Sequence, residues 1–416
     1  MQKTSSTKDN LLLSFSTMPT ATRSARCASV ATKAILLSLA LIIHIPKARA
    51  AAPENMTPLL LAVHDAPIPF LGSDGHIHLV YELWMTNFSS ADIDVQKVEV
   101  LGDDVTLQSL DAAAVTQRLQ PVGLRESTGK LAKSTNALLF LNVTLPLGTD
   151  IPHQLTHRVT LNASAAPPGH QAISEDGGAI TVDRQSVVTV APPLHGERYV
   201  SADSCCDAVR HTRAAMPING RMWVTQRFAV DWEQLDANNR IYSGPQEKLE
   251  SYTIFGNPIF AVADATVESV TDGMPEQTPG KYPADISVNT ADGNSVILKL
   301  ADHCYALYAH MQPGSIKVHR GDKVKLGQEI GLVGNTGNSL APHLHFHVMD
   351  GPSALASNGL PYQIDDFQIT AKTPGTAAFD EAEGKGIPLA IVPVSPPQPL
   401  QNAMPLDQQI ISFLAR

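Results

Sequence analysis

Apolar residues alternate with polar ones along much of the region between residues 52 and 195. The stretch 76–86 carries an apolar side chain at every second position, and the same spacing recurs at 139–145 and around His157. A period of two is typical of β-strands that bury one face. Turn-forming residues separate these stretches, and no strong helical pattern lies between them. We therefore predict that residues 51–195 form an all-β domain with an immunoglobulin-like sandwich fold.

The first of these strands divides its side chains between two faces. Its apolar face consists of Ile77, Leu79, Tyr81, Leu83 and Met85. His76 and His78 lie on the opposite face, but no third ligand of suitable spacing is near. We interpret them as half-exposed strand residues rather than a metal site. This region shows no catalytic constellation, so its expected role is binding or spacing.

A second strand-rich region, predicted to be a separate domain over residues 196–371, follows the proline-containing linker 191–196. Its most informative strand alternates histidines with apolar residues. The histidines share one face and are His343, His345 and His347. Because imidazoles are costly to bury without partners, this face is expected to line a cleft or hold a metal.

The last part of the chain, residues 372–416, is rich in proline, alanine and glycine. This composition predicts a flexible, extended tail, with at most a short amphipathic turn at 406–414. The predicted fold is therefore all-β throughout, with a sandwich followed by a second antiparallel domain.

The first fifty residues have the pattern of an export signal. Arg26 and Lys33 precede the apolar run 34–45, and Ala48-Arg49-Ala50 offers small residues at the positions that a signal peptidase reads. We predict that residues 1–50 are a signal peptide and that the mature protein is periplasmic or extracellular. The apolar run is too short to span a bilayer comfortably, so no stable membrane span is expected.

The charge balance argues against nucleic acid as a partner. The chain has 416 residues and a net charge of −10, and the residues after the first fifty carry 23 basic against 39 acidic groups, a net charge of −16. A protein that neutralises phosphates needs the opposite balance or a basic cluster, and the sequence has neither.

Three cysteines remain after the predicted signal: Cys205, Cys206 and Cys304. Adjacent cysteines rarely pair with each other, because their Cα atoms are about 3.8 Å apart and a disulfide prefers more. In an exported chain we expect Cys304 to pair with Cys205 or Cys206. Three free, buried thiols are the alternative.

Four motifs in the second region resemble a known family. They are Tyr308-Ala-His310, Gly321-Asp-Lys-Val with Gly327-Gln, Gly331-Leu-Val-Gly-Asn-Thr-Gly337 and His343-Leu-His345. In order and spacing they are similar to the lysostaphin/LytM-type zinc metallopeptidases, which cleave peptide cross-links of bacterial peptidoglycan. The resemblance covers roughly 226–348 and implies a compact antiparallel β core built around a groove.

The resemblance also implies a site with one zinc ion. Asp231 and His345 would be zinc ligands, His343 the general base that takes a proton from the attacking water, and His310 the group that steadies the oxyanion or orients that water. The chain departs from the family at the first metal motif, where Arg227 stands in place of the first ligand histidine. A guanidinium has no lone pair to offer a metal.

Two outcomes follow from this replacement. One ligand is worth roughly 3 kcal/mol of zinc binding, and a cation about 4 Å from the ion costs several kcal/mol more. Either Arg227 swings out and another group replaces the histidine, or zinc is absent and Arg227 pairs with Asp231. His211 is the first candidate for the substitute because the segment before the strand can cross the groove. The other candidates are His347, His303, Cys205 and Cys206.

The function therefore has two interpretations. The first is an exported, zinc-dependent endopeptidase that hydrolyses the cross-link peptides of peptidoglycan. The second is a catalytically silent member of the same fold that binds peptidoglycan or regulates a cell-wall hydrolase. A lipoyl-type barrel is a weaker third reading, since no suitably placed lysine is present.

Overall fold

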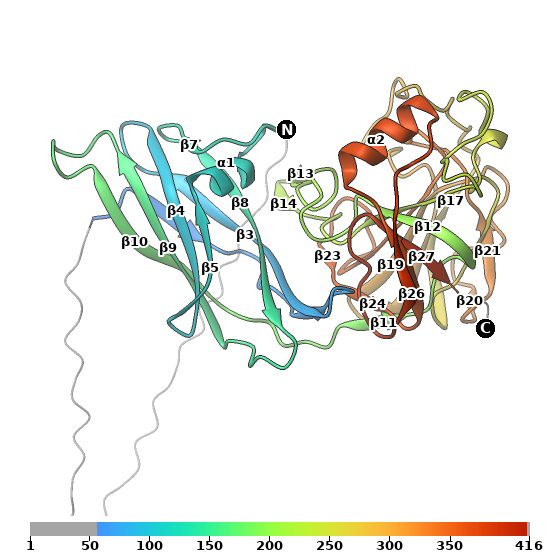
Figure 1. The fold of residues 1–416 in the computed structure, drawn as a ribbon, viewed down its shortest axis with the longest axis horizontal. Coiled ribbons are helices and arrows are strands. Elements are labelled where there is room, and N and C mark those ends of the chain that lie inside the picture. The colour runs from blue at the N-terminus through green and yellow to red at the C-terminus, as the bar shows by residue number, and fades with distance from the viewer. Residues whose placement is uncertain (1–55, 414–416) are drawn as a thin grey trace, which may run out of the picture. The chain divides into compact units, whose positions relative to one another are not determined.

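The computed structural model describes residues 56–413 (Figure 1). The predicted signal peptide, residues 1–50, lies outside the described residues. Within residues 56–413, no helix is long and apolar enough to cross a membrane. The prediction of an all-β fold is confirmed, since strands make up almost all of the regular structure.

The N-terminal part consists of two five-stranded antiparallel sheets. The first sheet contains β1 (Leu59–Ala62), β2 (Phe70–Leu71), β3 (His76–Asn87), β6 (Leu119–Pro121) and β8 (Asn136–Pro146). The second contains β4 (Ile93–Gly102), β5 (Val105–Asp111), β7 (Lys130–Leu131), β9 (Gln154–Ala163) and β10 (Ala172–Thr181). The short helix α1 (Ala112–Arg118) follows β5. The two sheets share one apolar core, so they form a sandwich, and its immunoglobulin-like topology stays a prediction.

Both faces of strand β3 are buried, although its alternating sequence predicts burial of only one. Its predicted apolar face lies in the sandwich core, with Leu79, Tyr81 and Leu83 fully buried. The opposite face is also buried, because Val80 packs into the core of the C-terminal part. The prediction of a half-exposed His78 is therefore wrong. Its side chain is 3% exposed and forms hydrogen bonds with Asp74 and Asn142.

The C-terminal part is built on an eleven-stranded antiparallel sheet. Ten strands lie in the order β20 (Lys323–Val324), β17 (Ala265–Thr271), β18 (Asn294–Ala301), β19 (Cys304–Met311), β22 (Leu344–Met349), β15 (Val230–Gln234), β12 (Gly196–Ala202), β27 (Gln409–Phe413), β25 (Phe367–Lys372) and β26 (Val392–Leu400), and β23 (Gly359–Leu360) pairs with β22. Smaller two-stranded pairs are β11 (Val188–Val190) with β24 (Tyr362–Ile364), β13 (Met216–Ile218) with β14 (Arg221–Trp223), and β16 (Pro258–Phe260) with β21 (Glu329–Leu332). A 3₁₀ turn at Leu249–Ser251 and the helix α2 (Thr376–Lys385) complete the regular structure of the described residues.

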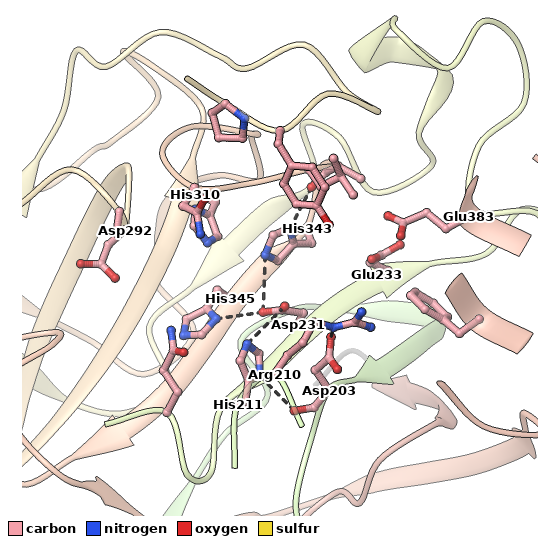
Figure 2. Close-up of a pocket in the computed structure, with 18 of the residues that line it drawn as sticks. Asp203, Arg210, His211, Asp231, Glu233, Asp292, His310, His343, His345 and Glu383 are labelled. Carbon is pink, nitrogen blue, oxygen red and sulfur yellow. Dashed lines mark hydrogen bonds and ion pairs between the residues drawn. The ribbon is translucent and has the colours of Figure 1, made fainter. Parts of the chain in front are cut away.

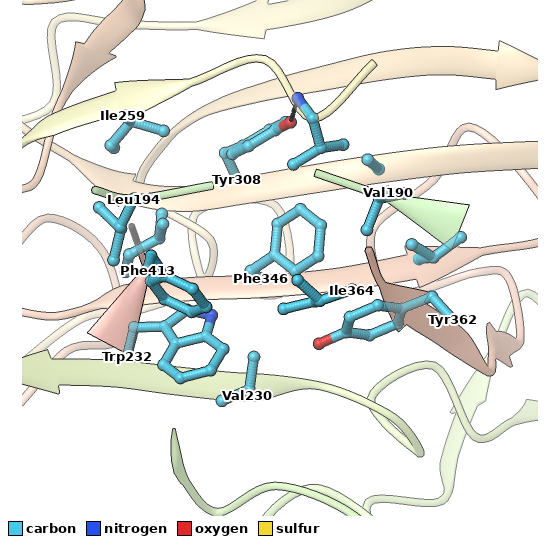
Figure 3. Packing of buried hydrophobic residues seen from close by; sticks show 14 of the residues in the cluster. Val190, Leu194, Val230, Trp232, Ile259, Tyr308, Phe346, Tyr362, Ile364 and Phe413 are labelled. Carbon is cyan, nitrogen blue, oxygen red and sulfur yellow. Dashed lines mark hydrogen bonds between the residues drawn. The ribbon is translucent and has the colours of Figure 1, made fainter. Parts of the chain in front are cut away.

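One face of this sheet carries the larger apolar core. Trp232 on β15 and Phe346 on β22 are fully buried there, and Phe413 of β27 packs edge-on against Trp232 (Figure 3). Because side chains alternate along a strand, the residues between these core positions point to the other face. Asp231 and His345 are such residues, so the core fixes the direction in which both face.

The prediction of a flexible tail over residues 372–416 is wrong for its described part. After β25, which ends at Lys372, the chain forms α2, β26 and β27, and β27 pairs with both β12 and β25. The strand β26 contains several prolines but lies at the edge of the sheet, where an N–H that faces away from the neighbouring strand has no ladder bond to lose. Composition alone predicts mobility, but the buried side chains of β27 anchor this segment.

The predicted linker, residues 191–196, is packed into the structure. Leu194 is fully buried in the larger core together with Val190. Residues on both sides of position 195 thus contribute to one core, and the domain boundary at that position stays a prediction.

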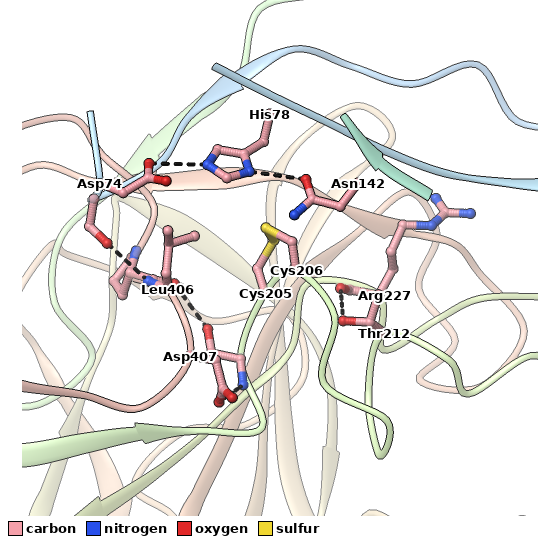
Figure 4. The surroundings of a disulfide bond; sticks show 12 residues. Asp74, His78, Asn142, Cys205, Cys206, Thr212, Arg227, Leu406 and Asp407 are labelled. Carbon is pink, nitrogen blue, oxygen red and sulfur yellow. Dashed lines mark hydrogen bonds and ion pairs between the residues drawn. A yellow bond between two sulfur atoms is a disulfide. The ribbon is translucent and has the colours of Figure 1, made fainter. Parts of the chain in front are cut away.

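The prediction of a disulfide to Cys304 is wrong. Cys205 and Cys206 form a disulfide with each other, across a cis peptide bond, and Cys304 is free (Figure 4). The two paired cysteines are buried beside Leu406, whereas Cys304 begins β19 at another place in the sheet.

Candidate metal centre

Two neighbouring strands bring the first pair of site residues together. Asp231 on β15 and His345 on β22 are directly opposed in the antiparallel ladder. Opposed residues on one face lie close enough for their side chains to interact. The Nδ1 atom of His345 is accordingly 2.8 Å from Oδ1 of Asp231 (Figure 2).

His211 approaches the same carboxylate from a loop. It lies between β12 and β13, and its Nε2 atom is 3.4 Å from Oδ2 of Asp231. Its Nδ1 atom is 2.9 Å from the backbone carbonyl oxygen of Asp203. A carbonyl can only accept a hydrogen bond, so Nδ1 carries the proton and the Nε2 lone pair of the neutral ring faces Asp231.

The resulting cluster fits a zinc ion. One ligand atom each from His211, Asp231 and His345 lies within 4.8 Å of the others, the single such group among residues 56–413. Ligand atoms of a tetrahedral zinc stand about 3.3–3.6 Å apart, given bonds of about 2.0–2.2 Å. Two imidazole nitrogens and one carboxylate oxygen form a donor set that zinc accepts, with a position left open.

The other ring nitrogen of His345 also has a partner. Its Nε2 atom is 3.0 Å from Nδ1 of His347, which is fully buried behind it. When Nδ1 of His345 serves as a ligand, Nε2 carries the proton and can donate it to His347. His347, one of the candidate substitute ligands, therefore orients His345 instead of facing the cluster, because it lies one pleat further along the strand.

Two further histidines border the cluster. His343 directly precedes β22, and its Nε2 atom is 3.4 Å from Oδ1 of Asp231. His310 lies near the end of β19, with its ring centroid 4.6 Å from that of His343. The register between β18 and β19 shifts at this point, and His310 has a positive φ of 61°. Such a bulge re-aims a side chain, and here it turns His310 toward the cluster.

Both bordering rings are held by backbone carbonyls. Nδ1 of His310 lies 2.7 Å from the carbonyl oxygen of Thr336, and Nδ1 of His343 lies 2.8 Å from that of Ala341. By the argument used for His211, the Nδ1 atoms donate. The Nε2 lone pair of each neutral ring is then free to accept a proton or a hydrogen bond.

Burial and charge act against each other at these groups. Burial raises the pKa of Asp231, but His211 and His343 outweigh it and hold that pKa well below its usual value. Burial lowers the pKa of His343, yet Asp231 outweighs it and the pKa is raised. Burial, reinforced by the neighbouring histidines, holds the pKa of His310 well below its usual value, so this ring is neutral.

Arg227 lies outside this cluster. The strand parity that was expected to bring it beside Asp231 does not apply, because residues 224–229 form turns and β15 begins only at Val230. The guanidinium instead forms two hydrogen bonds to the carboxylate of Glu82, at 2.9 and 2.6 Å. Of the two outcomes that this replacement left open, the Arg227–Asp231 ion pair is contradicted. Arg227 is turned away, and the cluster contains His211, the first candidate for the substitute.

The C-terminal segment holds the loop that carries His211. Arg210 forms ion pairs with Asp203 in the loop and with Asp380 on α2. The backbone N–H of Ser204 donates to the carboxylate of Asp407, which precedes β27 (Figure 4). The segment predicted to be a free tail thus positions one wall of the site.

The cluster opens into a cavity of about 470 Å³. Sequence reasoning missed two of its lining residues, Glu233 on β15 and Glu383 on α2. Burial raises the pKa of Glu233 well above its usual value and that of Glu383 to about 7. The same strand parity that singles out Asp231 also predicts Glu233, two residues further on, whereas no sequence signal connects Glu383 to the site.

Comparison with known proteins identifies part of the chain. Residues 251–357 match peptidase family M23. The matched segment includes His310, His343 and His345, while His211 and Asp231 lie before it.

Two curated relatives cover parts of the same region. The chain is 32% identical over 94 residues to peptidoglycan DD-endopeptidase ShyC of Vibrio cholerae, covering 23% of this chain and 18% of that protein. It is 45% identical over 110 residues to glycyl-glycine endopeptidase ALE-1 of Staphylococcus capitis, covering 26% of each. The chain thus spans about a fifth to a quarter of the length of these relatives.

Among solved structures, the catalytic domain of the antimicrobial peptidase lysostaphin from Staphylococcus simulans is similar. It shares 22% sequence identity and covers 39% of this chain and 88% of its own, with a TM-score of 0.22.

Proposed function

We propose that this chain, whose residues 251–357 match peptidase family M23, is a zinc-dependent endopeptidase that hydrolyses cross-link peptides of peptidoglycan. The observation that carries this proposal is the cluster of His211, Asp231 and His345 at the floor of a cavity. The substrate class is supported by two relatives whose names state that they are a peptidoglycan endopeptidase and a glycyl-glycine endopeptidase. Export through the predicted signal peptide, residues 1–50, is part of the proposal, since peptidoglycan lies outside the cytoplasm.

Zinc would be held by Asp231, His345 and His211. When bound, it supplies Lewis acidity to the scissile carbonyl and to the attacking water. His211 replaces the missing histidine of the first motif, because its Nε2 lone pair faces the carboxylate. When His345 binds a metal through Nδ1, the proton moves to Nε2, where His347 can accept it as a hydrogen bond.

His343 and His310 would manage the proton of the attacking water. His343 is the proposed general base, since its Nε2 atom lies 3.4 Å from Asp231 at the edge of the cluster and its Nδ1 atom is anchored to a carbonyl. His310 orients the water by accepting a hydrogen bond at Nε2. A neutral ring that already donates through Nδ1 has no second N–H, so it cannot donate to an oxyanion. Of the two roles that the resemblance implied for His310, this tautomer supports orientation of the water.

The alternative of a catalytically silent domain rested on Arg227. The guanidinium is held by Glu82, away from the carboxylate of Asp231, so it neither blocks nor repels a metal at the cluster. No other feature of the described residues favours the silent interpretation over the active one.

Replacing His211 tests the proposed ligand set. We expect the wild-type protein to hold one zinc ion and His211→Ala to bind zinc on the order of a hundredfold more weakly, because one of three protein ligands is lost. Competitive zinc titration measures the affinity, and release of soluble peptides from purified peptidoglycan measures hydrolysis. His303→Ala is the matched control, since this exposed histidine was a candidate ligand and lies at the opposite end of β19 from His310.

Three results would contradict parts of the proposal. Unchanged zinc affinity in His211→Ala shows that His211 is not a ligand. A wild-type protein that binds no zinc and releases no peptides favours the silent interpretation. A loss of zinc affinity in His303→Ala would show that the assignment of the ligand to His211 is wrong.

A further inference from the structure

Glu233 and Glu383 form an acidic pair in the cavity beside the candidate metal centre. Figure 2 shows their carboxylates turned toward each other, away from the histidine cluster. Glu233 is 5% exposed, and its Oε2 atom has no hydrogen-bond partner. An unpaired buried carboxylate is costly, so its presence needs an explanation.

Both side chains are held in place by the packing of their elements. Glu233 shares a strand face with Asp231, because Val230 and Trp232 between and beside them lie in the core. Phe379 and Ala382 of α2 are buried against the sheet. Glu383 follows Phe379 by one helical turn, so the same face of α2 turns it toward the cavity.

No cation within residues 56–413 neutralises the pair. None of their lysines, arginines or histidines lies within ion-pair distance of either carboxylate. Of the cations that line the cavity, Arg210 is already bound by Asp203 and Asp380, and His343 acts on Glu383 only as a neighbouring charge without an ion pair. The two buried carboxyl groups therefore lack a partner in the described part of the protein, and a cation or a shared proton in the cavity would offset their charge.

The chemistry of the pair selects its ligand. Among the described residues, no third histidine, cysteine or carboxylate joins the two glutamates to complete a metal site, and a divalent ion needs more ligands than two carboxylates. An ammonium group has three donors and a single charge, which two carboxylates satisfy well. Glu233 lies one pleat, about 7 Å, from Asp231, a span of about two residues of extended peptide.

We propose that Glu233 and Glu383 form a subsite that binds an ammonium group of the substrate peptide, such as the free amine of a diamino acid residue, next to the scissile bond. This inference rests on the proposed function for the identity of the substrate. Because Glu383 belongs to the segment after residue 371, this segment would help to select the substrate peptide. The segment lies outside the part of the chain that matches family M23.

A pair of stem peptides tests the subsite. One peptide contains a diamino acid with a free side-chain amine, and the other carries the same amine acetylated. Calorimetric titration of the purified full-length protein measures both dissociation constants. We expect the free amine to bind about tenfold more tightly, as expected for a partly buried charge pair. Glu383→Gln should bring the ratio to within about twofold, while Glu381→Gln should keep it, because Glu381 is an exposed residue of α2 paired with Lys385.

The outcomes separate the subsite from the proposed function. If the carboxyls only share a proton, the wild-type protein should bind the two peptides equally well or bind neither measurably. Either result overturns the subsite, even if the protein hydrolyses peptidoglycan. A preference that survives in Glu383→Gln overturns it as well. A preference that is lost in Glu383→Gln, in a protein that hydrolyses nothing, supports the subsite and contradicts the proposed function.

Two more measurements keep the test decisive. A second zinc equivalent that disappears in Glu383→Gln assigns the pair to a metal and overturns the ammonium subsite. Raising the salt concentration to about 1 M shortens the screening length to about 3 Å and should weaken the preference of the wild-type protein without any substitution.

Discussion

At the scale of single residues, the buried ion pair of Arg227 and Glu82 explains why the departure from the family motif leaves the cluster intact. The two side chains are 7% and 5% exposed and joined by two hydrogen bonds, and Asp65 lies 3.9 Å from the guanidinium. The pair joins β3 to the turn before β15. Both side chains are almost completely buried, so each charge depends on the other.

Removing one partner of this pair should destabilise the protein. We expect Glu82→Gln to lower the free energy of unfolding by about 3 kcal/mol, because it leaves Arg227 buried without its main counter-charge. The double variant Glu82→Leu/Arg227→Met should recover most of this loss. Urea denaturation measures all three proteins. The control Glu99→Gln breaks the ion pair with Lys97, which is more exposed than the Arg227–Glu82 pair, and should change the value by less than about 1 kcal/mol. A Glu82→Gln protein as stable as the control contradicts a structural role for the pair.

His157 in the sandwich core should make stability depend on pH. Burial lowers the pKa of His157 from 6.5 to about 4, and its Nε2 atom is 2.9 Å from the hydroxyl of Tyr81. Between these two pH values the unfolded chain binds a proton that the folded chain excludes. Stability should therefore be full above pH 6.5 and fall as the pH drops toward 4, by roughly 3 kcal/mol in total.

Comparison with His157→Gln isolates this effect. The pKa of Glu175 is raised by burial to about 7, which lowers stability as the pH rises from 4.5 to 7 and so acts in the opposite direction. Subtracting the pH profile of the variant from that of the wild-type protein cancels the contribution of Glu175. A difference that stays constant from pH 7 to 4 contradicts the assignment to His157.

At the scale of elements, the C-terminal segment is part of the site rather than an appendage. β27 inserts between β12 and β25, α2 holds Arg210 through Asp380, and Asp407 holds the start of the loop that carries His211. A strand in the middle of a sheet has ladder partners on both sides, so its loss breaks the sheet in two.

Substitution within β27 distinguishes an integral strand from a tail. Ile411 is fully buried, and we expect Ile411→Ala to cost about 2–5 kcal/mol of stability, as for other large-to-small changes in a core. Val392→Ala on the edge strand β26 is the matched control, because Val392 is 63% exposed, and it should change stability by less than about 1 kcal/mol. Thermal denaturation measures both. Equal, small effects would show that the segment adds little to the fold.

At the scale of the whole molecule, the candidate metal centre connects parts that are distant in sequence. His211 comes from a loop, Asp231 from β15 and His345 from β22, and the loop is tied in turn to α2. A ligand that binds only the folded arrangement stabilises it by mass action.

Zinc should therefore stabilise the folded protein, and a chelator should reverse the effect. With zinc at about a thousand times its dissociation constant, we expect a gain of about 4 kcal/mol in the free energy of unfolding. His211→Ala should lose about 3 kcal/mol of this gain at the same zinc concentration, given hundredfold weaker binding. His303→Ala should retain all of it. Denaturation with and without chelator measures the gain, and its absence in the wild-type protein contradicts a metal that bridges these elements.

The sequence by itself determined the strands and the direction of their side chains. A period of two in β3, β8 and β22 fixes which residues enter a core, and the same parity puts His345 on the face opposite Phe346. Together with the family resemblance it identified Asp231, His310, His343 and His345 as one site.

Only the tertiary structure decided what completes that site. The sequence put His211 first among several substitutes, and only the folded loop places it beside Asp231. Glu383 and the partner of Arg227 come from a helix and a strand that no local pattern links to the motif. The proline-rich end of the chain is ordered because β27 buries its side chains between two strands, a contact between residues some two hundred positions apart. Local alternation records which face of a strand is buried, but not which distant segment covers it, because that choice depends on packing and charge pairing across the whole fold.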